Sequence, residues 1–310
     1  MNNVLDVICV DKAKIEGKGE DAAAFYFSRP DIHYIGVYDG CGGAGAKKYR
    51  DMTGAYIASR YAAYIVGNLY ENGIQFSDLK ENIYKNLKSG FDNLNKKLLS
   101  ETSGLKIGGT MVKSLPTTAS MIFIEDTGSS DIIKCNYIWA GDSRGYFLDS
   151  SGMHQITKDD LNSDEDAFSN LYNDAVLSNV ICADNNFFLN SRIINIKLPA
   201  IVVSATDGSF GYYSTPMEFE YAVLSTLFES ESTEEWEEKL TVYTAEASGD
   251  DSSLLLALYG FESFSSLKKY FKARYEHLYY DYMQFITECS NEDLLYNLWL
   301  RYKKDYYREM

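Results

Sequence analysis

The chain has 310 residues and 45% of them are hydrophobic, which is enough for a sizeable core in one large domain or two ordinary ones. Its formal net charge of −16 opposes non-specific binding to nucleic acid, because that binding depends on Lys and Arg side chains that neutralise phosphates. No run of residues has the length and apolar character of a membrane span, and the N-terminus lacks the pattern of a signal peptide. We therefore expect neither nucleic acid nor a membrane as a partner.

The cysteines indicate the compartment. There are five, with no Cys-x-x-Cys pair among them: Cys9, Cys41, Cys135, Cys182 and Cys289. An odd, scattered set is typical of a protein whose thiols stay reduced. We expect a cytoplasmic location.

The predicted elements alternate between runs of strands and pairs of helices. In chain order they are strands at 4–10, 22–28 and 32–39, helices at 51–70 and 78–99, strands at 117–126, 133–142 and 144–149, a polar segment at 157–180, strands at 191–197 and 200–208, helices at 216–228 and 233–247, and a strand at 252–260. Strands that come in runs favour antiparallel sheets with helices on their outer faces over a parallel α/β fold.

Residues 261–310 are predicted to form two amphipathic helices. Apolar and aromatic residues at helical spacing predict one long helix that reaches Phe285 and a second one over 294–302. Ser290, followed by Asp293, resembles a capping box at the start of the second helix. The aromatic stripe of these helices either packs on the rest of the chain or contacts a partner or a second copy.

Several predicted strands have an acidic residue at one end, next to glycine or a small residue. These acids are Glu20, Asp21, Asp39, Asp142, Asp207, Asp250 and Asp251. One Asp-Gly pair is ordinary turn chemistry, but the ends of several strands meet at the rim of a sheet. Carboxylates gathered at one rim repel each other strongly, and divalent cations between them would remove that repulsion.

The segments around these acids resemble the metal-dependent serine/threonine phosphatases of the protein phosphatase 2C family. The matching pieces, in the order of the family, are GEDAAAF (19–25), GVYDGCGGAG (36–45), TTA (117–119), WAGDSRGYFLDSSGMHQITKDD (139–160), VVSATDG (202–208) and GDDSSLLLAL (249–258). The resemblance covers residues 1–260 and implies an α+β fold, a four-layer α-β-β-α sandwich of two packed antiparallel sheets flanked by helices. It makes 157–180 a flap beside the cleft and 261–310 a C-terminal helical extension.

The resemblance also implies a site for two Mn²⁺ or Mg²⁺ ions, and for a third ion in many members. Asp39 would bridge both ions, with Glu20 and the carbonyl of Gly40 on one of them and Asp21 in a supporting position. Asp207 and Asp250 would bind the other ion, and Asp142 with Asp207 the third. These hard oxygen donors suit Mg²⁺ or Mn²⁺. In this family a metal-activated water hydrolyses phosphoserine and phosphothreonine in proteins.

Two positions depart from the family pattern. Many members hold the substrate phosphate with an arginine four residues before the Glu-Asp pair, where this chain has Glu16. Lys14 or Lys18 could take over, and Lys14 is preferred because it shares a face with position 16 if the segment is extended. Many members also have a histidine, proposed as a general acid, where this chain has Cys41. Cys41 is either a packing residue, or a thiol acid or redox switch. The "GDSR" arginine, Arg144, is expected to be structural.

These departures leave an alternative function open. The chain would then be a catalytically weak pseudophosphatase that acts as a binding or regulatory module. The complete set of acids favours an enzyme, because a site without chemistry has no need to gather carboxylates. A small phosphate ester in place of a phosphoprotein is a further option, and the acidic segment 157–180 is expected to disfavour acidic phosphopeptides.

Overall fold

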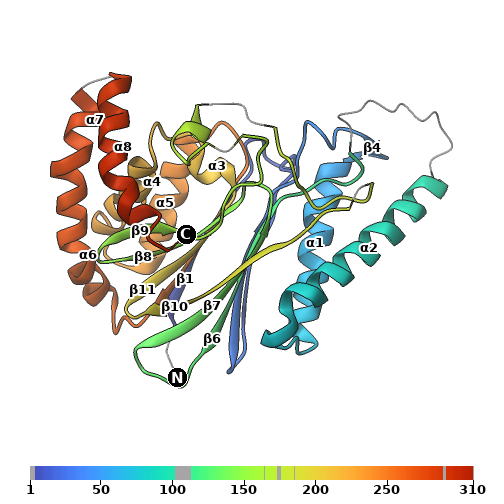
Figure 1. Ribbon diagram of the computed structural model, residues 1–310, viewed down its shortest axis with the longest axis horizontal. Helices are drawn as coiled ribbons and strands as arrows, with labels where there is room; N and C mark the ends of the chain where they lie inside the picture. Colours follow the sequence, from blue (N-terminus) through green and yellow to red (C-terminus); the bar gives the residue numbers. More distant parts are fainter. Residues whose placement is uncertain are drawn as a thin grey trace.

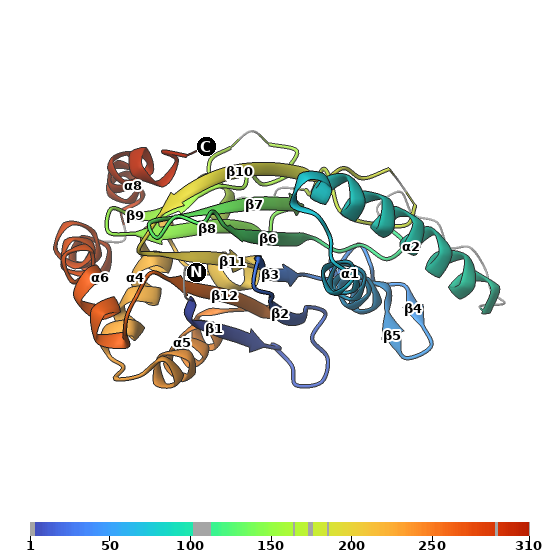
Figure 2. The ribbon, with the colours of Figure 1, turned by 90° about the horizontal axis from the view of Figure 1, so that it is seen from below.

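Two five-stranded antiparallel sheets packed face to face form the centre of the molecule (Figure 2). The computed structural model describes residues 4–101, 113–163, 165–172, 176–184, 186–288 and 291–309. The first sheet has the order β1 (Val4–Lys12), β12 (Ser252–Tyr259), β11 (Ala200–Ala205), β8 (Arg144–Asp149) and β9 (Gly152–Gln155). The second has the order β10 (Asn190–Lys197), β7 (Ile132–Ala140), β6 (Ala119–Asp126), β3 (Ile32–Tyr38) and β2 (Ala22–Ser28).

The space between the sheets is filled by apolar side chains from both of them. Val37 and Ile122 of the second sheet face Val202 and Leu255 of the first. Each residue of β12 is buried, because one face of the strand meets the other sheet and the opposite face lies under helices. A strand covered on both faces reads as a continuous apolar run, as residues 254–258 do in the sequence.

Helices cover the outer face of each sheet (Figures 1 and 2). On the second sheet lie α1 (Gly54–Glu71) and α2 (Leu79–Glu101). On the first lie α4 (Pro216–Phe228), α5 (Thr233–Ala247) and α6 (Phe264–Leu278). The predicted four-layer α-β-β-α sandwich is therefore confirmed.

The differences from the predicted strands and helices concern short elements. The predicted helix at 51–70 begins later, at Gly54, because Thr53 caps it by accepting a hydrogen bond from the Tyr56 N–H. A small hairpin of β4 (Lys48–Tyr49) and β5 (Met52–Thr53) precedes it. The four-residue strand β9 was not predicted, since so short a run carries no clear periodicity.

The C-terminal helices belong to the outer layer of the first sheet. The predicted long helix is α6 followed by a π-helical turn (Tyr279–Met283) and α7 (Gln284–Glu288). The last helix, α8 (Glu292–Tyr306), is capped by Asn291, which accepts from the Asp293 N–H; the predicted cap Ser290 lies outside the described residues. Phe271 and Trp299 are fully buried in the core that α4 and the first sheet share. The aromatic stripe thus packs on the rest of the chain, which was one of the two expectations.

A buried charged group joins three of these helices. Nε and Nη2 of Arg274 on α6 each donate to a carboxylate oxygen of Glu220 on α4 at 2.7 Å. The hydroxyl of Tyr302 on α8 donates to the same carboxylate. Glu220 is 0% and Arg274 7% exposed, and each is the ion-pair partner of the other within the described parts of the chain. This network fixes the position of α6 and α8 on the sandwich.

Within the described parts of the chain, no helix combines the length and the apolar character that crossing a bilayer requires.

Candidate metal centre

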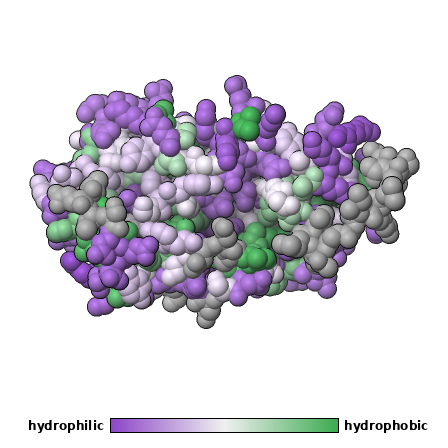
Figure 3. Space-filling view, turned by 90° about the horizontal axis from the view of Figure 1, so that it is seen from above, coloured by the Kyte–Doolittle hydropathy of each residue, from purple (hydrophilic) through white to green (hydrophobic). Residues whose placement is uncertain are grey.

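The predicted acids lie at one end of the sandwich, the end at which the short helix α3 (Asp207–Phe210) is labelled in the upper part of Figure 1. Asp39 follows β3, Asp142 follows β7 and Asp207 follows β11, while Asp250 precedes β12. Neighbouring antiparallel strands run in opposite directions, so the ends of some and the starts of others meet at one rim. These four residues and Glu20 line one cavity of about 590 Å³. Figure 3 looks onto this end, where hydrophilic surface runs through the middle of the face.

Asp39 is held by its backbone. Its carbonyl oxygen accepts from the Thr117 hydroxyl at 2.6 Å and from the Thr118 N–H at 2.8 Å. These two threonines belong to the "TTA" segment that the sequence singled out. The hydrogen bonds from Thr117 and Thr118 therefore fix the backbone at the end of β3, from which the Asp39 carboxylate extends.

Close approach of other segments explains some of the glycines after Asp39. A Cβ on Gly40 would lie 2.7 Å from the carbonyl oxygens of both Glu20 and Ala55. A Cβ on Gly42 would overlap the Glu20 carboxylate, whereas at Gly43 there is open space. Two of the glycines thus let helix α1 and Glu20 come up against the Asp39 strand.

Glu20 is positioned by Asp251, a residue to which the sequence gave no role. One oxygen of Asp251 accepts from the Glu20 N–H at 2.5 Å, and the other accepts from the Lys14 N–H at 2.8 Å. Arg60 of α1 donates to the Glu20 carbonyl at 3.2 Å from the opposite side. The signal in the sequence was the Asp-Asp pair at the start of the last strand, of which only Asp250 was assigned.

Asp21 lies beneath the cavity and does not line it. It is 7% exposed, and it accepts hydrogen bonds from the Thr206 hydroxyl at 3.0 Å and the Ser253 hydroxyl at 2.9 Å. Its supporting role at a metal site stays a prediction. Burial raises the pKa of Asp21 to about 7.

The carboxylates at this rim destabilise one another. Burial, and then the charges of Asp207, Asp21 and Asp142, raise the pKa of Asp39 well above its usual range. Burial and then Asp250 raise the pKa of Asp207 to about 6. One oxygen of Asp142, Oδ1, is buried without a hydrogen-bond partner among the described residues. A set of hard oxygen donors with surplus negative charge and a free buried oxygen fits divalent cations such as Mn²⁺ or Mg²⁺.

The donors surround the cavity without yet converging on one point. Among the described residues, no three His, Cys, Asp or Glu side chains are arranged as ligands of a single ion. Three of the acids instead use oxygens locally: Asp207 accepts from the Gly208 N–H at 2.7 Å, Asp250 from the Asp251 N–H at 2.9 Å, and Glu20 from the Thr53 hydroxyl. These oxygens are thus held by local hydrogen bonds, although the side chains line one cavity.

Lys14 does not line the cavity. The chain bends and turns after β1, so the extended segment on which its choice depended is absent, and the residue is exposed. Lys113 does line the cavity, and the sequence gave no signal for it, because only the folded chain brings residue 113 to the Asp39 loop.

Cys41 lines the cavity beside Asp39. Its N–H donates to the Pro116 carbonyl at 3.2 Å, and its carbonyl accepts from the Gly45 N–H at 2.8 Å. Burial, followed by the neighbouring carboxylates, raises the pKa of the Cys41 thiol well above its usual value. The thiol therefore keeps its proton at neutral pH and is a weak acid, and its role as a packing residue or as a thiol acid stays a prediction.

Arg144 is buried and forms a bidentate ion pair with Asp159, with Nε and Nη2 at 2.9 and 2.7 Å from its oxygens. Its guanidinium also lies over the Phe210 ring, 4.3 Å from the ring centre. Both contacts fit the structural role expected of it. Asp160 likewise accepts from the amides of Asn179 and Asn190, at 2.6 and 2.9 Å. Part of the acidic charge of segment 157–180 is thus bound inside the molecule, which weakens the expected bias against acidic phosphopeptides.

The C-terminal helix α8 holds the described part of this segment. Trp299 donates from Nε1 to Asp166 Oδ2 at 2.8 Å, and the Ala167 N–H donates to the Tyr307 hydroxyl at 2.6 Å. The ring of Phe168 stacks on Trp299 at 6.1 Å between ring centres. The last helix therefore fixes a stretch of chain that borders the acid cluster.

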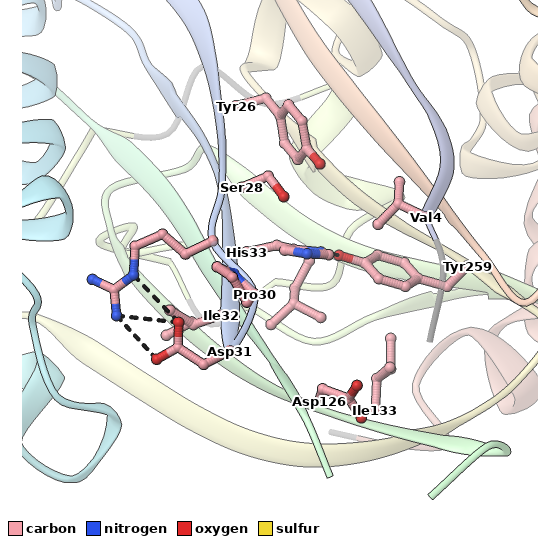
Figure 4. A pocket seen from close by; sticks show the side chains of 12 residues that line it. Val4, Tyr26, Ser28, Pro30, Asp31, Ile32, His33, Asp126, Ile133 and Tyr259 are labelled. Atoms are coloured by element: carbon pink, nitrogen blue, oxygen red, sulfur yellow. Dashed lines mark hydrogen bonds and ion pairs between the residues drawn. The ribbon is translucent and has the colours of Figure 1, made fainter. Parts of the chain in front are cut away.

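A second cavity, of about 550 Å³, opens at the opposite end of the sandwich (Figure 4). Its side chains are held by contacts of their own: His33 Nδ1 lies 2.7 Å from the Tyr259 hydroxyl, and Arg29 pairs with Asp31 at 3.0 Å. None of the predicted site residues lines it. The candidate centre is therefore the cavity at the acid-bearing rim.

No model of a known protein family matches the sequence, and a search of curated proteins found no similar sequence. Solved structures do share the fold. Serine/threonine phosphatase Stp1 from Staphylococcus aureus is 16% identical and superimposes with a TM-score of 0.59 over 84% of this chain and 97% of its own. Serine/threonine phosphatase PstP from Mycobacterium tuberculosis is 15% identical, with a TM-score of 0.55 over 84% of this chain and 100% of its own.

Two further structures extend the comparison. The catalytic domain of PstP has also been solved in complex with two manganese ions; it is 15% identical, with a TM-score of 0.53 over 83% of this chain and 99% of its own. A sex-determining protein of C. elegans is 16% identical, with a TM-score of 0.62 over 87% of this chain and 68% of its own. At these identities the likeness concerns the fold. The chain has the fold of the metal-dependent serine/threonine phosphatases, and the resemblance seen in the sequence is confirmed at that level.

Proposed function

We propose that the chain is a metal-dependent phosphatase that hydrolyses phosphoserine and phosphothreonine in proteins. The observation that carries the proposal is the gathering of Glu20, Asp39, Asp142, Asp207 and Asp250 around one cavity, with raised carboxyl pKa values at its centre. Folding has brought these acids together at an electrostatic cost, and divalent cations are the partners that would remove it. The same fold carries this activity in Stp1 and PstP.

Each acid has a proposed place. Asp39 would bridge two ions, Glu20 and the Gly40 carbonyl would complete one set of ligands, and Asp207 and Asp250 the other. A third ion would lie between Asp142 and Asp207, and Asp21 would orient Asp39 from below.

Bound ions would supply an activated water and neutralise charge on the phosphoryl oxygens. The chain's own contribution is to hold the donors. Asp251 fixes the Glu20 backbone, and Thr117 and Thr118 fix that of Asp39. The four cysteines that the structure describes are free, which is consistent with the proposed cytoplasmic location. A role in signalling would follow from the proposed activity on phosphoproteins.

Hydrolysis of an aryl phosphate and of a phosphothreonine peptide, with Mn²⁺ or with a chelator, tests the proposal. We expect turnover of both substrates that needs the metal. Turnover that resists the chelator would contradict it. Stabilisation by Mn²⁺ without turnover of either substrate would favour the pseudophosphatase alternative, and turnover of the aryl phosphate alone would point to a small phosphate ester.

A further inference from the structure

The structure describes one basic side chain in the lining of the cavity at the acid-bearing rim. Among the described residues that line it, six are acidic and only Lys113 is basic. We propose that Lys113 binds the phosphate group of the substrate, in the place that Glu16 cannot fill and that Lys14 does not reach. This inference rests on the proposed function and identifies the residue that binds the substrate phosphate.

Lys113 is fixed at the cavity by its backbone. Its N–H donates to the Ala44 carbonyl of the glycine loop at 3.0 Å. The next residue, Ser114, is held from the other side, since its N–H donates to the Asp184 carboxylate and its carbonyl accepts from the Ala183 N–H at 2.9 Å. The lysine therefore starts from a defined point on the cavity wall, next to the loop that presents Asp39.

The residue after these contacts supports the same conclusion. Leu115 has a φ of 58°, a left-handed conformation that a leucine side chain rarely adopts, and it is fully buried. Backbone strain of this kind persists where the surrounding structure imposes it, and it is common beside functional sites. Burial of Leu115 thus holds the backbone that follows Lys113 in a fixed conformation.

The charge of Lys113 is available for a ligand. Within the described parts of the chain, its ammonium group has no carboxylate at ion-pair distance, although the cavity is rich in acids. Two bound divalent ions would carry four positive charges against the six carboxylates. A substrate phosphate then brings new negative charge, and the lysine is the protein group in this cavity that can meet it. Lysine acts as a point charge and lacks the forked hydrogen bonds of arginine.

Lys113 could instead only reduce the net negative charge of the carboxylates, without contacting the substrate. The two roles predict different results. We compare Lys113→Ala and Lys113→Arg with the wild type, and Lys14→Ala serves as the matched control because Lys14 is exposed outside the cavity. The readouts are kcat and KM for an aryl phosphate, the inhibition constant of inorganic phosphate, and Mn²⁺ affinity measured by calorimetry.

If Lys113 binds the phosphate, Lys113→Ala raises KM and the inhibition constant of phosphate about tenfold or more, because a hydrogen bond to a charged group is lost. Mn²⁺ affinity stays within a few-fold of the wild type, Lys113→Arg recovers most of the loss, and Lys14→Ala changes nothing. If Lys113→Ala leaves KM and the inhibition constant of phosphate unchanged and binds Mn²⁺ more tightly, the inference is wrong. Metal-dependent turnover by the wild type would still uphold the proposed function in that case. A wild type that neither binds Mn²⁺ nor hydrolyses the ester would overturn both.

Discussion

Asp39→Asn is expected to abolish Mn²⁺-dependent hydrolysis and, at the same time, to stabilise the metal-free protein. Loss of the bridging carboxylate removes a ligand from both proposed ions, and we expect turnover to fall about 1,000-fold or more. An uncharged amide of the same shape also relieves the repulsion that raises the pKa of Asp39 well above its usual range. The gain in free energy of unfolding should be about 1–2 kcal/mol at neutral pH without metal.

The pH dependence has a definite sign. Because Asp207 and Asp21 have pKa values of about 6 and about 7 in the folded protein, the folded state binds protons more tightly than the unfolded state does. Stability of the metal-free wild type should therefore fall as the pH rises from about 4 to about 7, and Mn²⁺ should restore it.

Urea unfolding with a chelator and with Mn²⁺ measures both effects. Asp6→Asn is the control, since Asp6 is exposed and lies far from the cavity. A metal-free Asp39→Asn protein that is less stable than the wild type would show that the acid cluster is not under repulsion.

Glu220→Gln is expected to lower the free energy of unfolding by about 3–5 kcal/mol, since it leaves Arg274 buried without a counter-charge. Arg274 approaches the Glu220 carboxylate at 2.7 Å with two nitrogens, and Tyr302 of α8 loses its charged acceptor as well. The double variant Glu220→Leu with Arg274→Met should regain most of the stability, because it removes both charges together.

The exposed pair of Glu81 and Lys85 on α2 gives the comparison. Its side chains are 63% and 65% exposed and 3.2 Å apart, so Glu81→Gln should cost no more than about 0.5 kcal/mol. Urea unfolding of Glu220→Gln, of the double variant and of Glu81→Gln measures these changes in the free energy of unfolding. Equal costs for Glu220→Gln and Glu81→Gln would mean that the buried network does not hold the C-terminal helices in place.

The sequence was informative where chemistry and local pattern coincide. Asp39, Asp142 and Asp207 each follow an apolar run, so a place at a strand end could be predicted for each of them. That they share one rim depends on the strand order, in which β3 and β7 both flank β6, and on how the two sheets pack. The four layers could be inferred from the runs of strands and helices. Short motifs at the rim carried the resemblance, while the core tolerates many well-packed apolar side chains, which agrees with identities of 12–16% to structures of the same fold.

Contacts between distant segments could not be read from the chain. Lys113 reaches the cavity because its backbone pairs with Ala44, and Asp251 reaches Glu20 over 231 positions. Trp299 meets Asp166 over 133 positions. No local pattern encodes these approaches, since each depends on how the layers pack. Lys14 was preferred on an assumed extended segment, and the turn after β1 removes that assumption.

Anomalous diffraction at the manganese edge, from crystals of the protein soaked in Mn²⁺, tests the central claim most directly. The account predicts strong peaks within ligand distance of Asp39, one towards Glu20 and the Gly40 carbonyl and one towards Asp207 and Asp250. Fully soaked crystals without a peak among these residues, or with manganese bound only elsewhere, would contradict it.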